Sequence, residues 1–389
     1  PKMRSMNDAH DQPLAADILS GRAGATALPR VGRAAKVVLA NLALIVLSVL
    51  FVLGTTEVFL RVFSPQSIVP RYVEVSEAGI RKNIGYVQGV MSTAEFRHRF
   101  TTNSQGFRGQ REYARPKPAG IYRIIVLGDS VTLGHGVEDD DTFSAVAERA
   151  LEPSRPVEII NMGVSGFGTA EELIQLQRTG LSYEPDLVVL AYFPNDPYNN
   201  VVSKLFSVAD DRLVRTADAF VPALYIRDRL YAIPGYGFLC DHSHAINFLR
   251  GRLSAFFLDY LGRANGTSSE ISSELTVEEA ELTRRLLQEI ERVAHERTVP
   301  LVLLNIPVIL KGRMIDNFPL SLPKTGRALP VVVDVGRTVY ANHPLEELSY
   351  RDDSHPRPYG HRLIGEALAQ QVRERVWTVQ ASRHEASPQ

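Results

Sequence analysis

Residues 122–136 read YRIIVLGDSVTLGHG, an apolar run that leads directly into Gly128-Asp129-Ser130. A short apolar run bounded by glycine is typical of a strand buried in a parallel sheet. Glycine lets the chain turn sharply, so Ser130 is presented at the carboxyl end of the strand, where α/β folds bind their ligands. On its own, Gly-Asp-Ser after a strand is equally consistent with a plain turn.

The chain beyond this stretch repeats the same pattern. Four further β-branched runs follow, at 157–163, 186–193, 300–307 and 330–335, with helical segments at 142–151, 170–178 and 276–297. The last helix has a capping box, Thr276 with Glu279, and one apolar stripe. This alternation predicts an α/β fold: a flavodoxin-like three-layer α/β/α domain with a five-stranded parallel sheet.

Composition excludes several classes of function. Charges nearly cancel over the 389 residues, with 43 basic against 44 acidic side chains, so no global field favours nucleic acid. A single cysteine, Cys240, excludes an internal disulfide and a cysteine-cluster metal site. We expect no metal and no organic cofactor.

The segment Val37–Leu53 reads VVLANLALIVLSVLFVL and carries no charge. About 17–20 apolar residues suffice to cross a bilayer as a helix, which predicts one transmembrane anchor at 37–54. A cleaved signal peptide and a buried core helix are the alternatives. Positive charges precede the segment, which places the N-terminus in the cytoplasm and the rest outside it, in the periplasm or at the cell surface; they are Arg22, Arg30, Arg33 and Lys36.

These boundaries divide the chain. We expect a disordered cytoplasmic tail at 1–36, the anchor, a juxtamembrane connector at 55–118, an α/β domain at 119–380 and a C-terminal tail at 381–389. Within the domain, residues 197–275 form an insertion far longer than an ordinary loop. Its apolar and aromatic segments predict helices, either closing an edge of the sheet or covering the site as a cap.

Three further motifs fall at the ends of later strands. They are NMGVSGFG (161–168), FPND (193–196) and DDSH (352–355). Glycine in the first allows close backbone approach, and the amide of Asn195 is a hydrogen-bond donor. Asp352 precedes His355 by three residues, about one helical turn, so its carboxylate would hold the imidazole in the tautomer of a general base. The adjacent Asp353 is the other candidate for this role.

The four motifs together resemble the blocks of the SGNH (GDSL-type) hydrolase superfamily over roughly residues 103–378, apart from most of the insertion. The resemblance implies Ser130 as nucleophile, Asp352 and His355 as its catalytic partners, and an oxyanion hole made by Ser130, Gly166 and Asn195. The third block departs from the family pattern, because Phe193 and Pro194 stand where glycines are usual, which leaves the substrate class open.

The function that this resemblance implies is a serine esterase that works through an acyl-serine intermediate on an ester or an acetylated carbohydrate. An O-acetyltransferase or deacetylase that acts on envelope or exported polysaccharide is the alternative. A second alternative is a non-catalytic envelope scaffold with the insertion as its contact surface. The membrane is an expected partner through the N-terminal helix, and the sequence leaves protein partners open.

Overall fold

The computed structural model describes residues 32–221, 224–265, 271–319, 330–378 and 380. The chain divides into two compact units, Pro1–Thr55 and Thr56–Gln389. Residues 1–31 of the predicted N-terminal tail and the predicted C-terminal tail at 381–389 lie outside the described residues.

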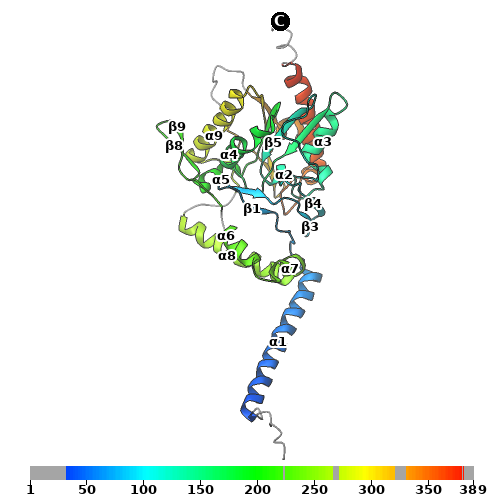
Figure 1. The fold of residues 1–389 in the computed structure, drawn as a ribbon, viewed down its shortest axis with the longest axis vertical. Helices are drawn as coiled ribbons and strands as arrows, with labels where there is room; N and C mark the ends of the chain where they lie inside the picture. Colours follow the sequence, from blue (N-terminus) through cyan, green and yellow to red (C-terminus); the bar gives the residue numbers. More distant parts are fainter. Residues whose placement is uncertain (1–31, 222–223, 266–270, 320–329, 379, 381–389) are drawn as a thin grey trace, which may run out of the picture. The chain divides into compact units, whose positions relative to one another are not determined.

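The second unit is built on one parallel sheet of five strands, in the order β13-β10-β7-β5-β6 (Figure 1). In sequence order this is 2-1-3-4-5, so the predicted flavodoxin-like order is confirmed. The strands are β5 (Tyr122–Gly128), β6 (Val157–Asn161), β7 (Leu187–Tyr192), β10 (Leu301–Asn305) and β13 (Val331–Asp334). Each lies within or beside the run that predicted it.

Helices cover both faces of this sheet, which confirms the three layers. On one face, α3 (Phe143–Leu151) and α11 (Pro358–Gln371) pack on the side chains of Ile124 and Val126. On the other, α4 (Thr169–Arg178) and α9 (Val277–Glu296) pack on Ile125 and Leu127. Figure 1 shows α3 and α4 on opposite sides of β5. Successive side chains of a strand point to opposite faces, so a near-continuous apolar run serves both cores.

The connector forms two antiparallel hairpins, one of β1 (Val73–Val75) with β2 (Arg81–Asn83), the other of β3 (Gln88–Ser92) with β4 (Arg97–Thr101). It binds the end of β6: the Asn83 amide donates to Gly163 O at 2.9 Å, and Arg108 N–H donates to Asn161 O at 3.3 Å. The connector therefore packs on the α/β domain at the edge where the motifs lie.

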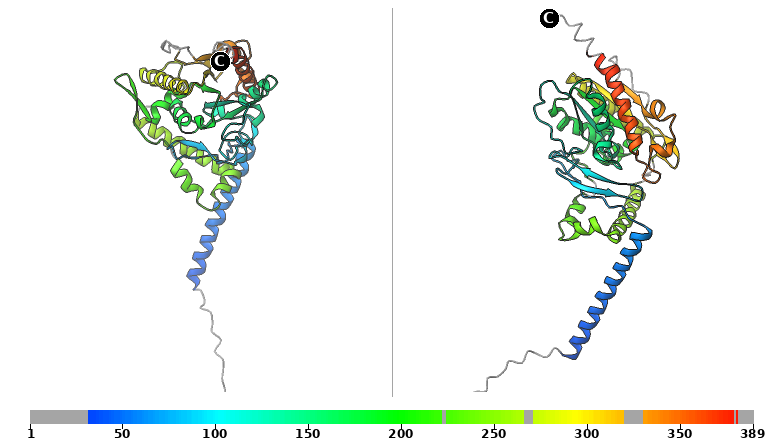
Figure 2. Two further views of the ribbon diagram at one scale, coloured as in Figure 1. Left: turned by 45° about the horizontal axis from the view of Figure 1, so that its top comes forward. Right: turned by 90° about the vertical axis from the view of Figure 1, so that its right-hand side faces the viewer.

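The insertion has two parts. The first, α5 (Asp196–Ser203) with the hairpin β8 (Phe206–Ala209) and β9 (Arg212–Arg215), packs on α9. The second is α6 (Leu224–Tyr231), α7 (Tyr236–His242) and α8 (His244–Asn265). This part contacts the connector, for example where Arg71 pairs with Asp228 at 2.9 Å, and Figure 2 shows it on the connector side of the sheet.

Shorter elements complete the chain. They are α2 (Ser130–Leu133), the hairpin β11 (Val308–Leu310) with β12 (Arg313–Ile315), α10 (Leu345–Leu348), the 3₁₀ turns Asp139–Asp141 and Gly180–Tyr183, and the π-helical turns Gly336–Tyr340 and Val372–Trp377.

Helix α1 (Arg33–Phe63) contains the predicted anchor and continues through Gly54. Its segment Ala35–Phe63, whose most apolar 18 residues have a mean hydropathy of 2.8, is the one helix among the described residues that is long and apolar enough to cross a membrane. None of its most apolar window is buried, whereas a core helix would be. Residues 56–63, the last two turns of α1, belong to the second unit.

Close packing of the loop after β6 against α2 generates a stability prediction. A Cβ at Gly163 would lie 2.3 Å from Leu133 N, a backbone atom that has no rotamer by which to move away. Gly163→Ala should therefore lower the free energy of unfolding by about 1–3 kcal/mol. Urea unfolding in detergent measures this, with the fluorescence of Trp377, which packs edge-on against Tyr122, as the signal.

Gly251→Ala is the matched control. Nothing lies within 4 Å of a Cβ at this position in α8, so alanine should be neutral or stabilising by up to ~1 kcal/mol through its helix propensity. Equal stabilities of the two variants would contradict the packing argument.

Candidate active site

Ser130 is the first residue of α2, directly beyond the end of β5. Asp129 caps this helix by accepting a hydrogen bond from Val131 N–H at 2.8 Å. The helix has a single turn, so its macrodipole contributes less to the site than a full helix would. The short helix instead positions Ser130, because it presents this half-buried residue at the carboxyl edge of the sheet.

The structure brings Ser130 and His355 together across 225 residues of chain. Ser130 Oγ lies 2.8 Å from His355 Nε2, within hydrogen-bond distance. His355 lies in the loop between α10 and α11, where its carbonyl oxygen accepts bonds from Tyr350 N–H at 2.9 Å and Ser349 Oγ at 2.9 Å. These bonds hold the backbone of the histidine in place.

The carboxylate that meets this imidazole belongs to Asp353, which corrects the first choice, Asp352. Asp353 Oδ1 lies 2.5 Å from His355 Nδ1, while Asp352 is exposed. The expectation assumed helical geometry, but residues 351–353 form a turn and Ser354 adopts a positive φ of 60°. In that turn, side chains two residues apart meet.

Electrostatics within this group favour a charged carboxylate and a basic imidazole. Burial alone would raise the pKa of Asp353, but hydrogen bonds from His135 and His355 hold it well below its usual range. Burial would lower the pKa of His355, but the hydrogen bond and the negative charge of Asp353 outweigh it, so the pKa lies above the ordinary 6.5. Such an imidazole readily accepts a proton from Ser130.

A second histidine shares the same carboxylate. His135 Nε2 lies 3.4 Å from Asp353 Oδ2, and the rings of His135 and His355 are 4.6 Å apart. Burial lowers the pKa of His135, so its neutral form is favoured. The residue stands in the opening GDSVTLGHG stretch, but nothing in its spacing indicated this contact.

The connector holds the turn that carries Asp353. The Glu95 carboxylate, between β3 and β4, accepts hydrogen bonds from three consecutive N–H groups: Arg351 and Asp352 at 2.9 Å and Asp353 at 3.0 Å. A carboxylate that binds a row of backbone donors fixes their orientation. No motif marks Glu95, and more than 250 residues separate it from the turn.

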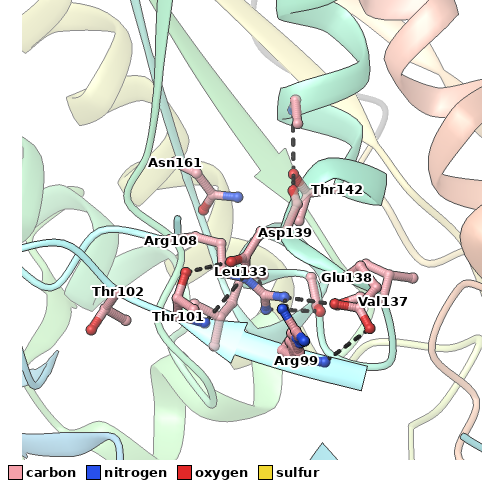
Figure 3. Close-up of polar contacts among 12 residues, drawn as sticks. Arg99, Thr101, Thr102, Arg108, Leu133, Val137, Glu138, Asp139, Thr142 and Asn161 are labelled. Carbon is pink, nitrogen blue, oxygen red and sulfur yellow. Dashed lines mark hydrogen bonds and ion pairs between the residues drawn. The ribbon is translucent and has the colours of Figure 1, made fainter. Parts of the chain in front are cut away.

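Arg108 fixes the loop after α2 in a similar way (Figure 3). Its buried guanidinium donates to the carbonyl oxygens of Leu133 and Gly134 at 3.1 Å and of Val137 at 2.7 Å, and it pairs with Asp139 at 2.5 Å. The loop between these acceptors contains His135. A cavity of 480 Å³ adjoins this network and is lined by Arg99, Glu138, Asp139 and Asn161 among others, but Ser130 and His355 are not among its lining residues.

The two other predicted donors lie on the neighbouring loops. Gly166 has a positive φ of 77°, and a Cβ there would lie 2.5 Å from Arg81 Nη1, so the position suits glycine alone. Asn195 Nδ2 donates to Asp129 Oδ2 at 3.1 Å. An amide nitrogen carries two N–H groups, so this bond orients the side chain beside Ser130 and leaves one N–H for a substrate oxygen.

Three fully buried carboxyl groups lie behind the site, in Asp129, Glu172 and Asp196. Burial raises the pKa of Asp129 and raises those of Glu172 and Asp196 well above their usual ranges, and the charges of neighbouring carboxyl groups add to the last two. The protonated forms of Glu172 and Asp196 are therefore favoured, which limits negative charge near the place where an oxyanion would form.

Among the described residues, one group of three potential metal ligands lies close together: His135, Asp353 and His355, with ligand atoms within 4.8 Å of one another. The Asp353 carboxylate already lies against both imidazoles, and His355 Nε2 already lies within hydrogen-bond distance of Ser130 Oγ. This arrangement suits a serine–histidine–acid relay, in which the imidazole removes a proton from the hydroxyl.

Comparison with known proteins gives similarities of fold only. No protein-family model and no curated protein matches this chain. Among solved structures, it is similar to a lipase/acylhydrolase from Enterococcus faecalis (17% identity, 65% of this chain and 96% of that one, TM-score 0.37). A lipolytic protein of the G-D-S-L family from Veillonella parvula DSM 2008 is also similar (11% identity, 65% of this chain and 99% of that one, TM-score 0.36).

A third similar structure is a two-domain esterase active on acetylated mannans (15% identity, 69% of this chain and 51% of that one, TM-score 0.37). At these identities and TM-scores, the likeness by itself establishes neither a family nor an activity for this chain.

The correction from Asp352 to Asp353 is testable. Asp353→Asn removes the charge that favours the imidazolium, so reaction of Ser130 with a fluorophosphonate should slow by about 10⁴-fold. Reaction requires neutral His355. In the wild type the rate should therefore fall as pH drops through a midpoint above 6.5, and in Asp353→Asn this midpoint should move to lower pH. Rates measured across pH check both changes.

Asp352→Asn is the control, since the exposed Asp352 makes no side-chain contact that bears on the imidazole in the structure as described. Its rate and midpoint should match those of the wild type. A larger loss in Asp352→Asn than in Asp353→Asn would restore the original assignment.

The contact of Glu95 with the turn generates a further prediction. Glu95→Gln replaces one carboxylate oxygen by an amide N–H group that faces other N–H donors, so the turn should shift. We expect the labelling rate to fall by ~10- to 100-fold and its pH midpoint to move down with the loosened Asp353–His355 pair. Urea unfolding of the same sample monitors the fold.

Glu112→Gln is the matched control, because Glu112 also lies in the connector and also accepts from a backbone N–H, that of Ser104 at 2.8 Å. It should leave both rate and midpoint unchanged. A wild-type midpoint in Glu95→Gln would show that Glu95 does not position the acid.

Proposed function

We propose that this chain is an SGNH-type serine esterase that cleaves carboxylic esters through an acyl-serine intermediate. The observation that carries the proposal is the relay at the sheet edge, with Ser130 Oγ 2.8 Å from His355 Nε2 and Asp353 Oδ1 2.5 Å from His355 Nδ1. A hydroxyl with a general base in reach, itself oriented by a carboxylate, is the arrangement that activates a nucleophilic serine.

In the proposed mechanism, His355 Nε2 accepts the proton of Ser130 as Oγ attacks the ester carbonyl. Asp353 stabilises the imidazolium that forms. His355 then gives its proton to the alcohol that leaves, and the acyl group remains on Ser130. Water, activated by the same imidazole, attacks the acyl-serine and restores the free hydroxyl.

The negative charge of the tetrahedral intermediate requires donors fixed in advance. Candidates are the N–H groups of Ser130 and Gly166 and the Asn195 amide, which Asp129 orients. One such donor is typically worth ~2.7–4 kcal/mol of transition-state stabilisation. The raised pKa values of the buried carboxyl groups support the same role, since fewer charges then oppose the oxyanion.

The proposal also includes a membrane anchor and its orientation. The length and composition of Ala35–Phe63 support a membrane-spanning anchor. Positive charges before it support a cytoplasmic N-terminus and an esterase domain on the opposite side of the membrane.

The test treats the full chain in detergent with a fluorophosphonate probe and then with short-chain p-nitrophenyl esters and acetylated sugars. We expect covalent labelling and release of the acyl group, both abolished in Ser130→Ala. Ser154→Ala removes an exposed serine remote from the relay and should label and hydrolyse as the wild type does.

Product analysis in the presence of a sugar acceptor distinguishes the fate of the acyl group. Free acid indicates hydrolysis, whereas an acylated sugar indicates transfer and would replace the esterase assignment by an acyltransferase. Activity that persists in Ser130→Ala and in His355→Ala would refute the mechanism, and a wild-type chain that neither labels nor hydrolyses would favour the scaffold.

A further inference from the structure

Exposed apolar side chains concentrate in α6–α8. Outside α1, most of the large apolar residues that the described part of the chain exposes fall between residues 225 and 256. Seven of these are about half exposed or more: Tyr225 (64%), Ile226 (67%), Ile233 (53%), Phe238 (65%), Leu249 (54%), Leu253 (49%) and Phe256 (64%). Scattered apolar residues are normal on a protein surface, but exposed apolar residues concentrated on helices that contact one another, as α6 with α7 and α7 with α8 do, indicate a contact with a membrane or a partner.

The last turns of α1 contact the junction of α7 and α8, in the middle of this apolar group. The Glu57 carboxylate accepts hydrogen bonds from Ser243 Oγ at 2.8 Å, His244 N–H at 3.1 Å and Ala245 N–H at 2.9 Å. Arg61 donates to His242 O at 2.6 Å. An anion at the N-terminus of the long helix α8 is electrostatically favourable, so the start of α8 is held at Glu57.

The charges of α1 locate this contact in a bilayer. Residues 37–56 carry no charge, and these 20 residues span ~30 Å as a helix, the thickness of a hydrocarbon core. Glu57 and Arg61 are the first charged residues beyond them. If the segment spans a membrane, as proposed above, both lie at the membrane–water interface, and α7 and the start of α8 lie there with them.

The composition of α6–α8 suits that interface. Residues 224–256 contain four arginines and two aspartates, which gives a net charge of +2. They also contain several tyrosines and phenylalanines. Arginines and aromatic rings next to exposed aliphatic side chains are typical of helices that lie in the headgroup region of a bilayer.

We propose that α6–α8 form a second membrane contact, an interfacial platform that lies in the outer surface of the bilayer crossed by α1. This inference rests on the anchor of the proposed function and goes beyond it, because the platform would hold the esterase domain against the lipid surface instead of leaving it on a tether. The bilayer is favoured over a second copy or another protein because the apolar group is bonded to the interfacial end of α1.

The platform also lies close to the candidate site. Arg71 pairs with Asp228 of α6, and the next residue, Tyr72, donates its hydroxyl hydrogen to Ser165 Oγ at 2.7 Å, beside Gly166. Docking of α6–α8 would therefore set the distance between the lipid surface and the relay.

The experiment uses the full chain in vesicles of phosphatidylethanolamine and phosphatidylglycerol with brominated acyl chains, which quench nearby tryptophan. The wild-type chain contains only Trp377 and supplies the baseline. Phe238→Trp and Leu249→Trp add a reporter to the platform. Apolar groups of interfacial helices lie roughly 5–10 Å into the headgroup–acyl boundary, so we expect about a twofold loss of the added emission, greater with bromine near the headgroup than near the chain end.

Val277→Trp is the matched control. Val277 is 88% exposed at the start of α9, outside the platform, and its reporter should not be quenched. Emission from Phe238→Trp and Leu249→Trp that is independent of bromine would overturn the proposal, as would a chain that alkaline extraction releases from the vesicles. Emission that changes with protein concentration instead of bromine would assign the surface to a second copy.

Fluorophosphonate labelling of the same vesicles separates this inference from the proposed function. Labelled but unquenched protein would retain the esterase and reject the platform. Quenched but unlabelled protein would retain the platform and reject the esterase.

Discussion

A hydrogen bond of 2.8 Å between Ser130 Oγ and His355 Nε2 joins the end of the first sheet strand to the loop before the last long helix. A serine hydroxyl is a weak nucleophile until a base lies within reach, so the chemistry of this site depends on holding two residues 225 positions apart at that separation. The parallel sheet makes this achievable, because it brings the carboxyl ends of its strands to one edge. The α3 and α11 helices pack on the same face of the sheet and against each other.

The sheet alone does not complete the site. Asp353 sits in a turn of exposed and half-buried residues, and the carboxylate of Glu95 binds three of the N–H groups of this turn. Arg108, from the same connector, binds the carbonyl oxygens of the loop that carries His135. Both contacts pair a fixed charge with backbone dipoles, and such bonds are stronger than neutral ones. The connector is therefore part of the candidate active site and more than a tether.

The same connector contacts the second part of the insertion at its other end. Residues 57–73 bind α6–α8, and residues 95–108 bind the loops beside Ser130, with two hairpins in between. One continuous segment thus links the end of α1, an exposed apolar surface and the relay. If α6–α8 bind the membrane, as proposed, the same segment contacts both the membrane-bound helices and the loops that position the relay.

The sequence by itself determined the elements whose signals are local. Apolar runs predicted five strands in flavodoxin-like order, Thr276 and Glu279 predicted a helix start, and glycines marked the turns beside Ser130 and Gly166. It did not determine which acid meets His355, because that choice depends on a turn with Ser354 at positive φ. Nor did it identify Glu95, Arg108 or His135, since each acts through contacts with distant loops. Spacing along a chain encodes local periodicity, whereas long-range partners are selected only when the packed core brings separate loops into contact.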